Sequence, residues 1–243
     1  KLLPSIKTIC IMDPKYNYEY YDLMAIPNHD SINVTAEQEK RIVRFMGRLS
    51  YFSQDALDDA KKDFTQEFSE YTKSTLIGLI VGGDAQGYKF TKQKSDELVK
   101  KTRQVAKLLD AKVYGTTSGR TPVDQAAYIK SEIEKDSGTV YTMNGKNPYR
   151  AILGYSDVVV ITADTVSMLM EACATGALVL VYDIESIKSK RIRHFIAETI
   201  DLGMAYDIND MLENRDIKEA LVSSTQRAPF KSLENIAIFI KKS

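Results

Sequence analysis

Four short polar stretches of this chain each follow an apolar run, and together they could bind an anionic ligand. They are Gly82-Gly83-Asp84, Ser118-Gly119-Arg120-Thr121, Asn147-Pro148-Tyr149 and Thr162-Ala163-Asp164-Thr165. Glycine lets a ligand approach the backbone, and arginine can bind phosphate or carboxylate with two parallel hydrogen bonds. If the apolar runs are parallel strands of one sheet, these stretches converge at a single edge, where ligands bind. That convergence is more informative than any one stretch.

The last stretch opens the segment TADTVSMLMEACATG, residues 162–176. Here the sequence predicts a strand over 157–162 and a helix over 166–175, with Ser167 in the first helical turn. The free N–H groups and the dipole of a helix N-terminus favour phosphate. Glu171 lies one turn after Ser167 on nearly the same face, where a carboxylate could accept hydrogen bonds from a ribose diol.

Each of these residues also has a purely structural interpretation, and spacing alone does not decide between the two. Asp164 or Thr165 could cap the helix, with Met168 in the core and Glu171 in solvent. The glycine pair could serve a turn, and Arg120 could be a surface residue. The chain has no G-x-G-x-x-G segment and no P-loop, which disfavours the usual dinucleotide and ATP sites.

His29 and His194 are the only histidines of the chain. His29 stands beside Asp30 in a predicted turn, where the two could form an acid–base pair, although a lone loop histidine is more often incidental. No Ser-His-Asp or Cys-His arrangement is visible, and no cluster of cysteine and histidine suggests a metal.

Alternating strands and helices would position the polar stretches. The sequence predicts strands at 6–12, 23–26, 45–47, 76–81, 112–117, 139–142, 157–162 and 178–182. It predicts helices at 54–71, 95–109, 122–135, 166–175, 189–202, 216–224 and 233–242, with a short helix after Asn147-Pro148-Tyr149. Thr121 is the expected N-cap of the helix that starts at Pro122. This alternation predicts a Rossmann-like α/β fold with a doubly wound, mostly parallel sheet.

Two parts are expected along the chain. Residues 1–72 would be the remnant of an N-terminal Rossmann-like domain with a connecting helix. Residues 73–243 would form the C-terminal Rossmann-like domain, whose last helix crosses back onto the first part. The chain opens without Met and directly in an apolar run, which suggests a piece of a longer protein.

Composition narrows the class of protein. Thirty-three basic residues balance thirty-three acidic ones, which gives no sign of a nucleic-acid groove. Two cysteines are too few for a disulfide framework, and no apolar stretch reaches the length of a membrane span. The expectation is a cytoplasmic protein without a metal or cofactor.

Order and spacing of the motifs from about residue 10 to 203 resemble the mitochondrial fission ELM ("elongated mitochondria") family, in its bacterial form. The motifs are Asp13-Pro14, Pro27-Asn28-His29-Asp30 with Asn33-Val34, Gly82-Gly83, Arg120-Thr121-Pro122, Asn147-Pro148-Tyr149, and Thr162–Met168 with Glu171-Ala172 and Thr175-Gly176. The resemblance implies a GT-B glycosyltransferase-like fold that takes a nucleoside-diphosphate sugar without a metal. It places the diphosphate on Thr165–Ser167 and the ribose on Glu171.

The site residues expected on these grounds are Gly82, Gly83, Ser118, Arg120, Thr121, Asn147, Tyr149, Thr162, Asp164, Thr165, Ser167, Met168 and Glu171, with His29 and Asp30 as the general base. Some positions depart from the family pattern. Gly119 replaces the first of two arginines, Thr165 replaces serine, Ala177-Leu178 replaces Lys-Pro, and Met204-Ala205-Tyr206 lacks an arginine. Family members are also longer at the N-terminus, so binding is a safer expectation than catalysis.

Three functions remain open. The first is a GT-B-like protein that transfers a sugar, with inversion, from a nucleotide sugar to an unknown acceptor. The second is a non-enzymatic docking protein, because the plant relative recruits a dynamin-like GTPase to a membrane surface; this allows peripheral association with a membrane. The third is a sugar-nucleotide epimerase on the same scaffold.

Overall fold

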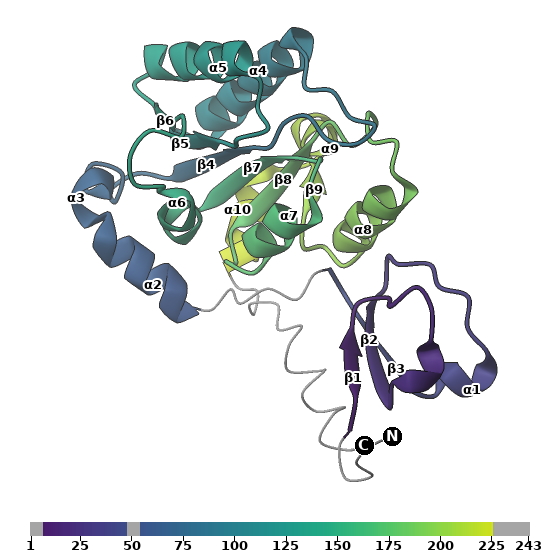
Figure 1. Cartoon of the computed structure of the whole chain (residues 1–243). Helices are drawn as coiled ribbons and strands as arrows, with labels where there is room; N and C mark the ends of the chain where they lie inside the picture. The colour runs from purple at the N-terminus through teal and green to yellow at the C-terminus, as the bar shows by residue number, and fades with distance from the viewer. Residues whose placement is uncertain (1–6, 48–53, 226–243) are drawn as a thin grey trace. The chain divides into compact units, whose positions relative to one another are not determined.

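Apolar runs form parallel strands in both parts of the computed structural model, which describes residues 7–47 and 54–225. The described residues fall into two units, 7–47 and 54–225, each with a sheet of its own. Figure 1 shows the course of the chain through both.

Three short parallel strands make up the sheet of the first unit. They are β1 (Ile9–Ile11), β2 (Leu23–Pro27) and β3 (Ile42–Phe45), in the order β1-β2-β3. A 3-10 helix, η1 (Tyr18–Tyr20), and the short helix α1 (Ala36–Glu39) connect them, and α1 begins with a capping box between Thr35 and Gln38. Met24, Ile26 and Ile42 form the buried core of one sheet face.

Six parallel strands form the sheet of the second unit, in the order β6-β5-β4-β7-β8-β9. Their bounds are β4 (Leu76–Val81), β5 (Lys112–Thr117), β6 (Thr139–Tyr141), β7 (Val158–Thr162), β8 (Leu178–Tyr182) and β9 (Tyr206–Asp207). The chain starts at β4, moves outward to β6, and returns to place β7 on the other side of β4. This is the Rossmann order, and the predicted α/β fold is confirmed.

Helices cover both faces of this sheet. They are α4 (Lys92–Leu109), α5 (Val123–Lys135), α6 (Tyr149–Tyr155), α7 (Val166–Cys173), α8 (Lys190–Asp201), α9 (Ile208–Asn214) and α10 (Ile217–Thr225). Figure 1 shows α4 and α5 on one face and α7 and α8 on the other. The reversal of strand order at β4 and β7 requires this, because right-handed crossovers in opposite directions put their helices on opposite faces. Strands β4, β7 and β8 are therefore buried along their whole length.

The predicted connecting helix over 54–71 is two helices, α2 (Gln54–Asp63) and α3 (Thr65–Phe68), and it belongs to the second unit. Phe68 is fully buried, with its ring stacked 4.5 Å from that of Tyr114 and 4.7 Å from that of Tyr155. Helix α2 packs against α6. The boundary expected at residue 72 is therefore wrong: these aromatic contacts tie the segment to the sheet that follows it.

Strands 76–81, 112–117 and 178–182 have the predicted bounds, whereas several other elements differ. The strand expected at 45–47 lies at 42–45, since Gly47 adopts a positive φ of 72°. Strand β9 and helix α9 were not predicted, because a two-residue strand carries no periodicity. The helix expected at 233–242 lies outside the described residues.

Candidate functional site

The ends of β4, β5 and β7 meet at the carboxyl edge of the six-stranded sheet. Strand β4 lies between β5 and β7 in the sheet, so the segments after these three strands are neighbours. The strand order reverses between β4 and β7, and in open α/β sheets this switch point is where ligands bind. Three of the four predicted polar stretches are thus brought together here.

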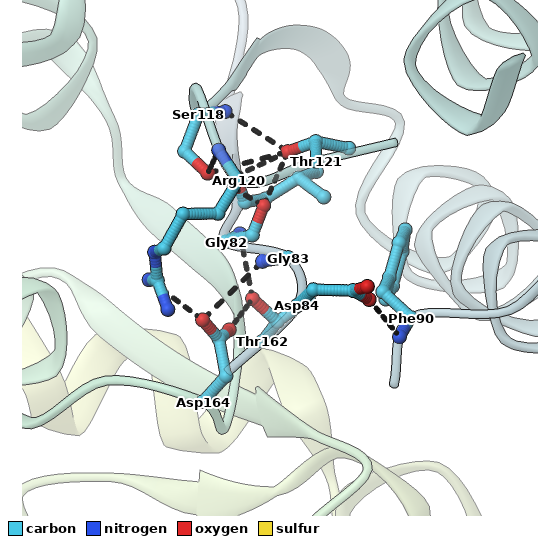
Figure 2. A network of polar contacts seen from close by, with 10 residues as sticks. Gly82, Gly83, Asp84, Phe90, Ser118, Arg120, Thr121, Thr162 and Asp164 are labelled. Atoms are coloured by element: carbon cyan, nitrogen blue, oxygen red, sulfur yellow. Dashed lines mark hydrogen bonds and ion pairs between the residues drawn. The ribbon is translucent and has the colours of Figure 1, made fainter. Parts of the chain in front are cut away.

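A buried carboxylate joins these segments (Figure 2). Asp164, whose side chain is 0% exposed, lies with Oδ2 2.8 Å from Arg120 Nη2. The Gly83 N–H donates to the same oxygen at 3.3 Å, and the Thr162 hydroxyl donates to Oδ1 at 2.6 Å. Thr162 in turn accepts a 2.8 Å hydrogen bond from the Gly82 N–H. Asp164 is therefore not the helix cap that one interpretation of the sequence expected.

The two glycines make room for this network. A Cβ at Gly82 would overlap the carboxylate of Asp164, and a Cβ at Gly83 would overlap the backbone of Arg120. The predicted close approach at the glycine pair is therefore an approach of other parts of the same chain. The approach of a ligand to these glycines stays a prediction.

Ser118 and Thr121 fix the loop that carries Arg120. The Ser118 hydroxyl donates to the Gly82 carbonyl at 2.7 Å, and the Thr121 hydroxyl donates to the same oxygen. The expectation that Thr121 caps the next helix is wrong: α5 begins at Val123, with Pro122 in the cap position and no side-chain cap. The Thr121 hydroxyl is engaged by the β4 end and by the Ser118 N–H instead.

The start of α7 adjoins this network. Thr165 occupies its N-cap position in extended conformation, but its side chain makes no capping hydrogen bond. Ser167 and Met168 follow in the first turn and are half-buried. The helix thus presents first-turn N–H groups without a cap from Thr165, which together with the helix dipole suits an anion.

Tyr149 and Glu171 form a second polar pair at this edge. The Tyr149 hydroxyl, on α6, donates to Glu171 Oε2 on α7 at 2.6 Å. Burial, followed by the adjacent Glu171 carboxylate, raises the pKa of Tyr149 well above its usual range. Tyr149 therefore remains a donor at any ordinary pH. The Asn147 side-chain oxygen accepts the Tyr149 N–H at 3.0 Å, and the predicted short helix is α6, which begins at Tyr149 itself.

His29 and Asp30 lie in the first unit, in the turn after β2. The His29 Nε2 is 3.8 Å from Asp30 Oδ1, and the histidine side chain is 1% exposed. This is an ion-pair distance and not a hydrogen bond, so an acid–base pair of these two residues stays a prediction. A catalytic role for either stays a prediction.

A further group beside the site was not predicted. Asp183 follows β8 with a φ of 64°, which is unusual for a residue other than glycine. Its carboxylate accepts a 2.9 Å hydrogen bond from the Tyr88 hydroxyl and lies 2.8 Å from Lys94 Nζ. Burial, then Asp183 and Asp164, raises the pKa of the Tyr88 hydroxyl. The only signal in the sequence was the place of Asp183 directly after the strand predicted at 178–182.

Within residues 7–47 and 54–225, no group of three or more His, Cys, Asp or Glu side chains could hold a metal ion. In the same part of the chain, no helix is long and apolar enough to cross a membrane.

Comparison with solved structures supports the fold. The chain is similar to a *Listeria monocytogenes* protein assigned as a UDP-N-acetylglucosamine 2-epimerase, with 16% identity, a TM-score of 0.57, and coverage of 92% of this chain and 60% of that one. It is also similar to MurG of *Acinetobacter baumannii*, with 14% identity, a TM-score of 0.49, and coverage of 93% and 62%. At these identities the likeness concerns the fold alone, an α/β fold with parallel sheets.

Comparison with known sequences identifies the family. The chain is 27% identical over 209 residues to the mitochondrial fission protein ELM1 of *Arabidopsis thaliana*. The match covers 76% of this chain and 48% of the plant protein, so the chain spans about half of the relative's length. The family model for mitochondrial fission ELM1 matches residues 3–242. The chain therefore belongs to the mitochondrial fission ELM1 family.

Proposed function

We propose that this chain binds a nucleoside-diphosphate sugar at the carboxyl edge of the six-stranded sheet. The N–H groups at the start of α7, with Ser167, bind the diphosphate, and Arg120 binds it from the β5 side. Glu171 binds the ribose hydroxyls. The chemistry of the groups supports this division, because an uncapped helix start and an arginine suit phosphate, and a carboxylate suits a diol.

The observation that carries the proposal is the pairing of Glu171 with Tyr149. Glu171 lies one turn inside the helix whose start would hold the diphosphate. Its Oε2 is engaged by Tyr149 at 2.6 Å, while Oε1 accepts no hydrogen bond from any described residue. The carboxylate is thus oriented by one neighbour and retains an oxygen for a ligand hydroxyl. A solvated surface glutamate would have no such support.

We further propose that the bound sugar is transferred with inversion and without a metal. The bond between the anomeric carbon and the diphosphate breaks, and a bond to an acceptor hydroxyl forms. The acceptor proton passes to a general base. Arg120 and the helix dipole stabilise the charge that develops on the leaving diphosphate. The acceptor remains unidentified.

A docking function is the second candidate, and one observation favours it: the plant relative is named as a mitochondrial fission protein. In that function the edge would serve as a contact surface and bind no nucleotide. An epimerase would bind the same ligand but interconvert two sugar nucleotides without an acceptor.

Titration of the whole chain with UDP, GDP and ADP and their sugars, followed by calorimetry, tests the binding. One of them should bind, and Glu171→Ala should weaken it about 10-fold or more. Glu97→Ala is the matched control, since Glu97 also accepts a tyrosine hydroxyl, from Tyr182 at 3.2 Å, away from the proposed ribose position. Absence of binding by every nucleotide refutes the proposal and favours docking. Product analysis with a binding nucleotide sugar separates transfer from epimerisation.

A further inference from the structure

Asp164 cannot contact a ligand in this structure, although it lies at the centre of the candidate site. Its side chain is 0% exposed, and both carboxylate oxygens are already hydrogen-bonded by described residues. A buried carboxylate is costly unless a cation and donors compensate it. Contact with a ligand therefore does not explain why Asp164 lies at the switch point.

Arg120 is the cation that compensates it, and Arg120 is not buried. Its side chain is 43% exposed, and only Nη2 is paired, at 2.8 Å from Asp164 Oδ2. A guanidinium group carries five N–H donors in a fixed plane. The others donate to no described residue. One edge of the group is thus held by the protein while the rest can bind an anion.

The backbone of Arg120 is fixed as well (Figure 2). Its carbonyl accepts the Asp84 N–H at 3.0 Å, and its N–H donates to the Ser118 hydroxyl at 3.2 Å. Its carbonyl segment packs so closely on Gly83 that no Cβ fits there. With both backbone and guanidinium held, little rotamer freedom remains to be lost when a ligand binds.

We propose that Asp164 is a positioning residue: it holds the Arg120 guanidinium at the ends of β4 and β7 so that the remaining N–H groups bind the diphosphate of the ligand. This inference rests on the proposed function. It explains why a carboxylate occupies the centre of a site for an anion, since Asp164 acts through Arg120 and is shielded from the ligand.

A double-mutant cycle on the whole chain tests the proposal, with Asp164→Asn, Arg120→Gln and the double variant titrated against the nucleoside diphosphate that binds the wild type. Each single variant should lose about 10-fold in affinity, and the double variant should lose little more than either one. Losses that multiply in the double variant overturn the proposal. Asp157→Asn is the matched control. The Asp157 carboxylate accepts the Leu76 N–H at 2.9 Å, near the opposite ends of β4 and β7. The variant should bind the nucleotide with the affinity of the wild type.

Arg120→Lys keeps the test decisive if Asp164→Asn does not fold. Lysine retains the charge that Asp164 needs but lacks the planar fork, so it cannot serve both partners. It should keep the melting temperature close to that of the wild type while lowering nucleotide affinity about 5-fold or more. Wild-type affinity in Arg120→Lys overturns the proposal.

The side-chain ¹⁵N signals of Arg120 separate this proposal from the proposed function. In the free wild type these signals should show that rotation of the guanidinium group is hindered. In Asp164→Asn the group should rotate rapidly, a change that general destabilisation would not cause. Rapid rotation in the wild type overturns the positioning role even if nucleotide binds. Hindered rotation without binding by any nucleotide refutes the proposed function, and with it the part of the inference that assigns a diphosphate to Arg120.

Discussion

The Tyr149 hydroxyl donates a 2.6 Å hydrogen bond to Glu171 Oε2, joining α6 to the helix whose start is the candidate phosphate site. The carboxylate assigned to ribose therefore depends on a residue that follows a different strand. The sequence predicts that the polar stretches carrying these two residues converge at one edge of the sheet, but it does not predict the hydrogen bond between them.

Tyr149→Phe removes this hydrogen bond while keeping the ring. The free energy of unfolding should fall by about 1.5–3 kcal/mol, because a hydrogen bond to a charged group contributes roughly that much. Nucleotide affinity should fall about 3-fold to 10-fold as Glu171 loses its orientation. Calorimetric titration and thermal melting measure both. Tyr182→Phe, which removes the hydroxyl that donates to Glu97, should alter stability alone.

Glu171→Gln tests which hydroxyls the carboxylate binds. Affinity for a ribonucleoside diphosphate should fall about 10-fold, because a charge-assisted hydrogen bond is replaced by a neutral one. The 2′-deoxy nucleotide should bind the wild type more weakly than the ribonucleotide does, and its affinity should fall less when Glu171 is replaced. Equal losses for the two nucleotides would contradict a contact with the ribose diol.

Gly82→Ala should destabilise the fold by about 1–3 kcal/mol, because the added Cβ overlaps the Asp164 carboxylate and the core must shift. Denaturant unfolding measures the loss. Gly119→Ala is the matched control, since a Cβ there meets no atom within 4 Å. Equal stability of the two variants would show that the β4 end is not as closely packed as described.

Gly119→Arg introduces the first of the two arginines that the family resemblance leads one to expect in this loop, at a position with open space around it. An additional guanidinium beside Arg120 should raise affinity for a nucleoside diphosphate several-fold at low salt, and less at high salt, since screening weakens an exposed charge. Titration at two ionic strengths measures this. Unchanged affinity at both would place the diphosphate away from this loop.

Alkaline pH should destabilise the protein through its buried tyrosines. The pKa of Tyr149 is raised in the folded state, first by burial and then by Glu171, above the value of about 10 for an exposed tyrosine. The contribution of Tyr149 is thus complete below about pH 10 and is lost as pH rises beyond it, because the unfolded chain then releases the proton first. Unfolding measured across this range should show a shallower loss in Tyr149→Phe. Parallel curves would contradict the raised pKa.

Periodicity and strand-end chemistry predicted the second unit well. The continuous apolar runs of β4 and β8 have the predicted bounds, because buried parallel strands leave no polar interruption inside them. The candidate edge followed from their polar ends. The hydrogen-bond partners within that edge did not follow, because most of them lie between 22 and 81 positions apart in the chain.

Thr121 and Asp164 show the limit most clearly. Thr121 was expected to cap a helix, and capping was the structural alternative for Asp164, since this is the commonest use of such residues before a helix. In the fold each bonds instead to the end of β4, about 40 and 80 residues earlier in the chain. The unit boundary failed for the same reason, because α3 is held by rings of β5 and α6 that local patterns do not reveal.

A crystal structure of the whole chain with the nucleoside diphosphate that binds it tests the central claim most directly. The phosphates should lie within hydrogen-bond distance of the first N–H groups of α7 and of Arg120, with the ribose hydroxyls on Glu171. A nucleotide bound at any other edge of the sheet, or a ribose that makes no contact with Glu171, would contradict it.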